Sequence, residues 1–246
     1  MAKRKMAQKL LALALTLATF GCAIKPAPKV HGTIKTSRQP YTSRIGFIPN
    51  KRSNLQTLTT VEAENVSAYV WTNQQPREID TGLRYSRQLT ENLSARTGLD
   101  MWSYPGKDNP LGTRDFATEA GLNWQLPYKF NLNATLTHVF NDSNTESGQM
   151  AHATLSRPIQ FKTPGGLDAK LTPSLQTAYG RNYYSVSGHS QTTPGLSIRL
   201  TKPTKIGERP ARRQLFFEAF LKHQIGNKKQ GMEDFTCGGL GAGFKF

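Results

Sequence analysis

The sequence predicts an all-β fold, an antiparallel up-and-down transmembrane β-barrel of eight to ten strands, with ten favoured. Apolar and polar residues alternate with a period of two, which indicates strands with two different faces. Clusters of Gly, Pro, Asn and Asp separate the alternating stretches and mark turns. Beyond the N-terminus no stretch reaches the roughly 18 apolar residues of a membrane helix. Only β-structure could therefore place the remainder of the chain in a membrane.

The alternating stretches define the expected strands and their order. The ten ranges are 61–72, 78–88, 93–104, 114–126, 129–141, 149–161, 167–184, 191–202, 213–224 and 235–246. Most are close to the roughly 9–11 residues with which a tilted strand crosses the hydrocarbon layer. An even number returns both chain ends to one side. Residues 203–212 are long for a turn on that side, which leaves eight strands as an alternative.

One face of each expected strand is almost free of charge. In 130–140 the apolar side chains of Phe130, Leu132 and Leu136 alternate with Asn and Thr. Away from the strand ends the apolar faces carry no Lys, Arg, Asp or Glu, and the possible exceptions, Arg87 and Arg157, stand close to turns. A charge at mid-bilayer costs about 2–4 kcal/mol, so these faces are suited to lipid. A soluble barrel or sandwich gives the same alternation, and periodicity alone leaves it open.

Aromatic residues are expected to mark the membrane interfaces. They cluster near the expected strand ends, where interfacial belts place their rings at headgroup level. The residues concerned are Tyr69, Trp71, Trp102, Tyr104, Trp124, Tyr128, Tyr183 and Tyr184.

The polar faces would then line the lumen. They carry six acids and five bases: Asp80, Arg84, Arg96, Asp100, Asp115, Glu119, Asp168, Lys170, Arg199, Glu218 and Lys222. Charges of both signs on neighbouring strands predict ion pairs. Since eight strands leave an interior just filled by side chains, ten predict a largely filled, charge-balanced lumen. This composition excludes a wide channel and leaves a narrow solute pore as the alternative.

The N-terminus predicts export. Residues 1–22 read as a signal peptide, with Lys3, Arg4 and Lys5 ahead of an apolar run from Leu10 to Phe20. Residues 19–22, Thr-Phe-Gly-Cys, form an imperfect lipobox, with Gly correctly before Cys22 but Thr where Leu is usual. Lipidation of Cys22 and ordinary signal-peptide cleavage beside it both remain open.

The excess of positive charge lies mostly before the expected barrel. The chain has a net charge of +16, and residues 1–52 contain 11 Lys and Arg with no acid. Residues 23–57 are rich in Pro, Lys, Ser and Thr, which predicts a flexible basic arm before a barrel at 58–246. Charge alone would attract an anionic envelope component to the arm. Nucleic acid is not expected, because the arm has few aromatics and no recognition motif.

The last residues carry a resemblance. Gly241, Phe244 and the terminal Phe246 form a short strand with an aromatic row. The segment resembles the C-terminal assembly signal of bacterial outer-membrane β-barrel proteins. The resemblance implies residence in the bacterial outer membrane among its lipids, and transient recognition of these three residues by the barrel assembly machinery. It implies no subfamily and no ligand.

The remaining candidates concern chemistry. The chain has two Cys, no paired Cys motif and no His/Cys cluster, so neither a metal nor a cofactor is expected. His189 with Ser190, His152 with Ser156, and the two carboxylates Asp100 and Asp115 are the weak candidates for a lipid-modifying hydrolase. Neighbours on a strand point apart, which counts against His189 and Ser190. A structural or surface-interaction barrel, using loops around 105–113, 142–148 and 225–234, is therefore favoured over a pore or hydrolase.

Overall fold

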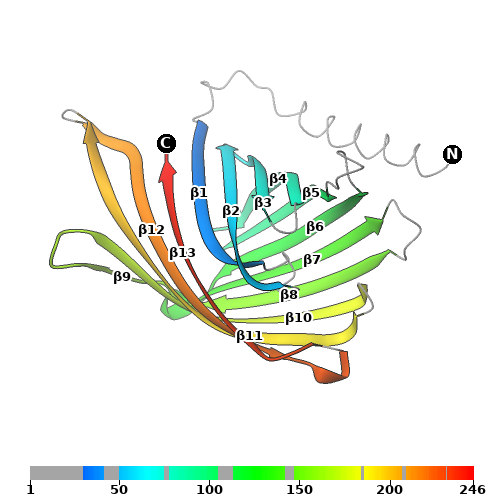
Figure 1. The fold of residues 1–246 in the computed structure, drawn as a ribbon. Helices are drawn as coiled ribbons and strands as arrows, with labels where there is room; N and C mark the ends of the chain where they lie inside the picture. The colour runs from blue at the N-terminus through cyan, green and yellow to red at the C-terminus, as the bar shows by residue number, and fades with distance from the viewer. Residues whose placement is uncertain are drawn as a thin grey trace, which may run out of the picture.

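A computed structural model shows a closed antiparallel β-barrel (Figure 1). It describes residues 30–41, 50–74, 78–104, 113–141, 147–183, 186–206, 209–230 and 232–246. The strands are β1 (Val30–Tyr41), β2 (Asn50–Ala63), β3 (Val66–Asn73), β4 (Glu78–Thr90), β5 (Leu93–Tyr104), β6 (Thr113–Gln125), β7 (Asn131–Asn141), β8 (Gly148–Ser156), β9 (Ile159–Lys162), β10 (Asp168–Tyr183), β11 (Val186–Ile206), β12 (Arg209–Gly226) and β13 (Phe235–Lys245). Two 3-10 turns, η1 (Pro127–Lys129) and η2 (Lys228–Gln230), lie between strands.

The thirteen strands occupy twelve positions around the barrel. Apart from β8 and β9, which both pair with β10, neighbours in sequence pair with each other, and the pairing of β13 with β1 closes the ring. β8 and β9 share one position, because they pair with successive parts of β10. The interruption between them contains Pro158, which has no N–H for the ladder.

The predicted all-β antiparallel barrel is confirmed, but the expected number of strands is wrong. The expected strand 61–72 spans a turn at Glu64 and Asn65, where Glu64 has a φ of 50°. β11 runs to Ile206 and β12 begins at Arg209, which removes the long turn expected at 203–212. The polar strand pair β1–β2 was missed.

β1 and much of β2 lie inside the range predicted to be a basic arm. That prediction is wrong for residues 30–41 and 50–57. β1 consists mostly of polar residues, and few of its residues are apolar. Its backbone pairs on one side with β13 and on the other with β2, so sheet closure stabilises it. The predicted signal peptide with Cys22 and the first part of the arm lie outside the described residues.

The two ends of the barrel differ. β1 begins and β13 finishes at the same end, as Figure 1 shows. We call this the terminal end. Its connections include the two-residue turns 64–65 and 91–92. At the opposite end, which we call the loop end, eight residues separate β1 from β2, β5 from β6 and β12 from β13.

The sheet has an apolar outer face and a polar inner face. The outer face presents large apolar side chains to the surroundings at every strand position, each at least 37% exposed. Each of the twelve positions contributes at least one of them; an example from each, in chain order, is Ile34, Leu55, Val70, Leu83, Leu99, Leu122, Leu136, Leu155, Leu175, Leu196, Phe217 and Leu240. No carboxylate lies on this face in the described strands. Its cations whose side chains are described stand within four residues of a strand end; they are Arg38, Arg87, Arg114, Arg181 and Lys202.

The predicted aromatic belts are partly wrong. The strand register puts Tyr69, Trp71, Trp102 and Tyr104 on the inner face with Asp80 and Asp100. Trp124 and Tyr128 are exposed, Trp124 on the outer face and Tyr128 in a turn. The side chains of Tyr183 and Tyr184 lie outside the described residues. No helix among the described residues is long and apolar enough to cross a membrane.

Candidate functional site: the polar interior

The strand register places the eleven charges expected in the lumen on the inner face. They come from six strands: β4 (Asp80, Arg84), β5 (Arg96, Asp100), β6 (Asp115, Glu119), β10 (Asp168, Lys170), β11 (Arg199) and β12 (Glu218, Lys222). Among the described side chains, sequence reasoning missed five more inner-face charges: Lys35, Glu62, Glu78, Lys162 and Lys245. Glu78 stands two residues before Asp80 in β4, so the alternation of faces could have placed it in the lumen as well. Lys35 was missed together with its strand.

A chain of polar contacts, the β3–β7 network, runs along one wall. The Tyr69 hydroxyl donates to Asp100 Oδ1 at 2.5 Å. Arg84 Nη2 lies 3.8 Å from Asp100 Oδ2 and 3.3 Å from Glu119 Oε2. Arg96 Nε approaches Glu119 Oε1 to 2.8 Å, an ion-pair contact without directed hydrogen-bond geometry. The Tyr69–Asp100 and Arg84–Glu119 contacts cross an intervening strand, whereas Arg84–Asp100 and Arg96–Glu119 join neighbouring strands. Arg96 Nη2 also donates to Thr135 Oγ1 of β7 at 2.8 Å, so the network links five strands, β3 to β7.

Glycines make these contacts across an intervening strand possible. A Cβ on Gly82 of β4 would stand 2.1 Å from Asp100 Oδ1 and 2.3 Å from the Tyr69 ring. A Cβ on Gly98 would meet Arg84 Cγ at 3.0 Å, and one on Gly121 would meet Arg96 Nε at 2.9 Å. The long side chains therefore lie along the wall, in the space that a side chain on the middle strand would fill.

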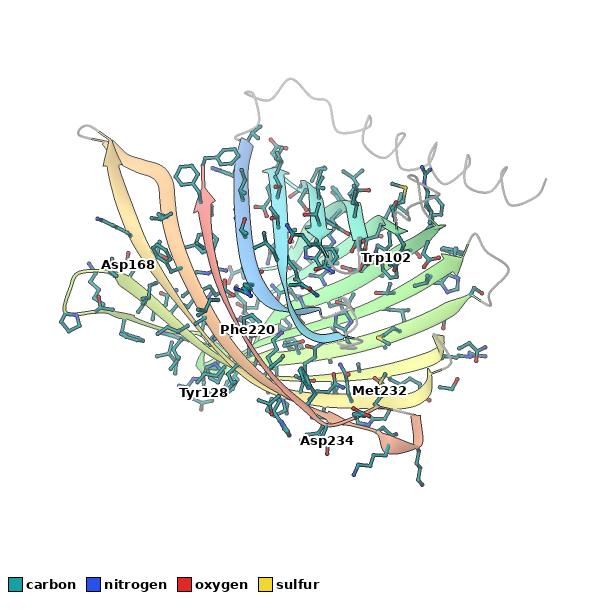
Figure 2. All side chains as sticks on the ribbon, viewed as in Figure 1. Trp102, Tyr128, Asp168, Phe220, Met232 and Asp234 are labelled. Atoms are coloured by element: carbon teal, nitrogen blue, oxygen red, sulfur yellow. The ribbon has the colours of Figure 1, made fainter. Side chains whose placement is uncertain are left out.

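A second set of charges, the β12 cluster, consists of Lys35, Arg199, Glu218 and Lys222. Lys35 Nζ lies 3.2 Å from Glu218 Oε1, and Arg199 Nη2 lies 2.8 Å from Glu218 Oε2. Two inner-face rings support the cations: Arg199 lies 4.6 Å over Phe216 and Lys222 lies 5.6 Å over Phe220. Phe220 is labelled on the barrel wall in Figure 2.

The β12 cluster also uses glycine to cross a strand. Lys35 belongs to β1 and Glu218 to β12, with β13 between them. Their side chains meet over Gly241, where a Cβ would stand 3.3 Å from Lys35 Cε. In the ring of twelve positions β12 stands opposite β5, so this cluster and the β3–β7 network occupy opposite walls.

Acids and bases differ in exposure on the inner face. On β4–β6 Glu78, Asp80, Asp100, Asp115 and Glu119 are all buried. The side chains of Arg84 and Arg96 retain 28% and 29% exposure, and that of Arg199 retains 47%. Lys222 is exposed as well. The bases on these strands therefore reach the interior surface, while the β4–β6 carboxylates lie beneath it. Among the described side chains, Glu62 of β2 and Asp168 of β10 are the exposed acids of the inner face.

An apolar cluster lies on the inner face towards the loop end. Trp102, Ala117, Val139, Met150 and Ala178 are buried together there, on strands β5 to β10. Figure 2 places Trp102 near that end. This wall is the most densely packed apolar part of the interior in the described chain.

The candidate catalytic residues do not form a reactive arrangement. Ser190 is buried and donates to the Ala178 carbonyl at 3.0 Å. The ring of His189 instead lies 3.2 Å from Thr192 Oγ1. His152 and Ser156 share the inner face of β8 four residues apart. Among the described residues no group of three His, Cys, Asp or Glu could hold a metal ion.

Asp100 and Asp115 lie on neighbouring strands of the inner face but do not stand directly opposite each other. Asp100 is held by Tyr69 and Arg84, as part of the β3–β7 network. In the strand register Asp115 stands opposite Trp102, and Asp100 stands opposite Ala117. The contacts with Tyr69 and Arg84 give the Asp100 carboxylate a structural role.

The residues of the predicted assembly signal lie at the closure of the ring. Phe246 exchanges two backbone hydrogen bonds with Gly32, at 2.8 and 2.9 Å. Its ring covers Gly32, and it stacks on Phe244 with centroids 6.2 Å apart. Gly241 faces the interior beneath Lys35. Recognition of these residues by assembly machinery remains a prediction.

No protein-family model and no curated protein matches the chain. Among solved structures, a bacterial polysaccharide outer membrane secretin is similar, with a TM-score of 0.48, 10% identity, and coverage of 90% of this chain and 98% of that one. The NanC porin gives a TM-score of 0.48 at 9% identity over 87% and 98% of the two chains. An outer membrane channel from Pseudomonas putida F1 gives 0.45 at 11% identity over 90% and 97%. At these identities the likeness concerns only the fold.

Proposed function

We propose that the chain is a bacterial outer-membrane barrel through which small hydrophilic solutes diffuse. The observation that carries the proposal is the wall of solvent-exposed, charged side chains that lie flat on the inner face of a twelve-position barrel. The narrow pore, the alternative to the filled barrel in the sequence analysis, thereby becomes the favoured function.

The outer face supports residence in a membrane. Its exposed apolar side chains form a ring around all twelve positions. Soluble monomers rarely expose continuous apolar patches beyond a few hundred Å². The five outer-face cations stand near strand ends, where long side chains can reach the headgroups. Short turns at the terminal end and longer connections at the loop end are typical of outer-membrane barrels.

The width of the barrel supports a pore. Barrel diameter grows roughly linearly with strand number, and about eight strands leave an interior that side chains just fill. Twelve positions give a barrel roughly half as wide again. Gly82, Gly98 and Gly121 keep the network side chains against the wall. Together these features leave room for water along the axis.

A surface-interaction barrel with a closed mouth is the second candidate. The buried cluster around Trp102 and Met150 favours it, because burial near the loop end indicates a packed mouth. In that case the loop-end connections would carry the function and the lumen would conduct nothing.

Planar-bilayer recording separates the two functions. The full chain, folded in detergent and checked by heat-modifiable gel mobility, is added to the bilayer. We expect discrete conductance steps of uniform size, and none from the heat-unfolded control. A barrel with folded mobility that never conducts would overturn the pore and favour the closed barrel.

A further inference from the structure

We infer that the β12 cluster is a binding site for small oxyanions, solutes that carry a carboxylate or a phosphate group. The site is made by Lys35, Arg199 and Lys222 around Glu218 on the inner face. The inference rests on the proposed pore for its route of access and names the class of solute that the pore would favour.

The cluster has an uncompensated positive charge. Glu218 is its single acid, and each carboxylate oxygen contacts a different base: Oε1 meets Lys35 and Oε2 meets Arg199. Lys222 forms no ion pair with any of the residues that the structure describes. Three cations against one carboxylate leave a net charge of about +2 on this wall at neutral pH.

The cations are held in place with donors to spare. Arg199 engages Glu218 through Nη2 while its guanidinium lies over Phe216, and its side chain keeps 47% exposure. Lys222 lies over Phe220 and is exposed. Contact with an aromatic face restrains a cation without using its N–H donors. Arg199 and Lys222 can therefore present N–H groups to an anion without first breaking an ion pair.

The opposite wall does not offer a competing site for cations. The five acids of β4–β6 are buried, and the partly exposed Arg84 and Arg96 stand in contact with Asp100 or Glu119. A solute in the interior thus meets basic groups on both walls. The excess charge is concentrated at the β12 cluster, and at physiological salt its field extends about 8 Å.

Titration of inorganic phosphate into the folded full chain in detergent micelles tests the inference, whether or not the barrel conducts. Binding is followed by phosphorus-31 line broadening and by calorimetry. We expect saturable binding that weakens as salt is raised. The variant Arg199→Gln/Lys222→Gln should bind at least about fivefold more weakly, since one unit charge at 4 Å in water changes an affinity by about that factor.

Arg87→Gln is the matched control, because it removes a cation from the outer face. It should leave the phosphate affinity unchanged. Absence of saturable phosphate binding would overturn the inference, as would equal loss in the two variants or no loss in the double variant.

Ion selectivity in the planar bilayer adds a second readout. Under a potassium chloride gradient the reversal potential should show a preference for chloride, and the double variant should lower the chloride-to-potassium permeability ratio about twofold or more. A folded barrel that binds phosphate but conducts nothing would refute the pore and leave the anion site standing. Conductance with a preference for potassium would refute the anion site and leave the pore standing.

Discussion

The hydroxyl of Tyr69 donates a hydrogen bond of 2.5 Å to Asp100, although the strands that carry them, β3 and β5, do not pair with each other. They meet over Gly82 of β4, the strand between them. Asp100 is buried, and its second oxygen faces Arg84. A glycine in the middle strand thus decides whether a buried carboxylate keeps its donor.

Replacing Gly82 by Ala should destabilise the barrel. The new Cβ would stand 2.1 Å from Asp100 Oδ1, so Tyr69 and Asp100 must separate. Loss of a buried hydrogen bond to a charged group costs about 1.5–3 kcal/mol. Urea unfolding in lipid vesicles measures the change. Gly165→Ala, at a position with no atom within 4 Å of the new Cβ, is the control and should be neutral.

The hydroxyl of Tyr69 can be tested by itself. Tyr69→Phe keeps the ring beneath Arg84, whose guanidinium lies 4.8 Å from it, and removes only the donor to Asp100. We expect a loss of about 1.5–3 kcal/mol in unfolding free energy. In the double variant Tyr69→Phe/Asp100→Asn the two losses should not add, because both break one contact. Tyr179→Phe, on the exposed outer face, serves as the control. Fully additive losses would show that the two side chains do not interact.

Much of the barrel could be predicted from the sequence because strand parity is a local property. The alternation in β5, β6 and β7 separates Leu99, Leu122 and Leu136 from the charged or polar residues on the other face. Ten of the twelve strand positions follow from this pattern. The face on which each of the eleven charged residues lies follows too, because residues two apart in one strand point to the same face.

The remainder depends on contacts between distant segments. β1 has little apolar pattern of its own, and its place is set by β13, some 200 residues later in the chain. The inward direction of Trp102 could have been inferred from its parity with Asp100 in β5, but its position near a strand end favoured an interfacial belt. The inward direction of Tyr69 in β3 follows only from the pairing of β3 with β4. The glycine crossings need the strand register, which no single stretch of sequence provides.

The outer face can be tested with one charge. Leu136 lies at the centre of β7, half-exposed on the outer face. In a membrane Leu136→Arg should cost about 2–4 kcal/mol, because the guanidinium would sit in the hydrocarbon layer. Folding into vesicles, followed by urea titration, measures this. Tyr128→Arg, in a turn at the terminal end, should be tolerated. If Leu136→Arg were as stable as the parent chain, the outer face would be in water.

Removal of Phe246 should lower the amount of folded barrel in the outer membrane. The residue exchanges two backbone hydrogen bonds with Gly32 across the β13–β1 closure, and its ring covers that glycine. Deletion removes this last pair of bonds and also the terminal aromatic residue of the predicted assembly signal. Phe246→Tyr keeps both the backbone pair and an aromatic end, and should fold normally.

Heat-modifiable gel mobility of membrane fractions measures the folded fraction. Folding in detergent separates the two effects: a deletion that folds there but not in cells points to recognition of the C-terminus, whereas failure in both points to closure of the ring. Unchanged mobility in cells would contradict both roles.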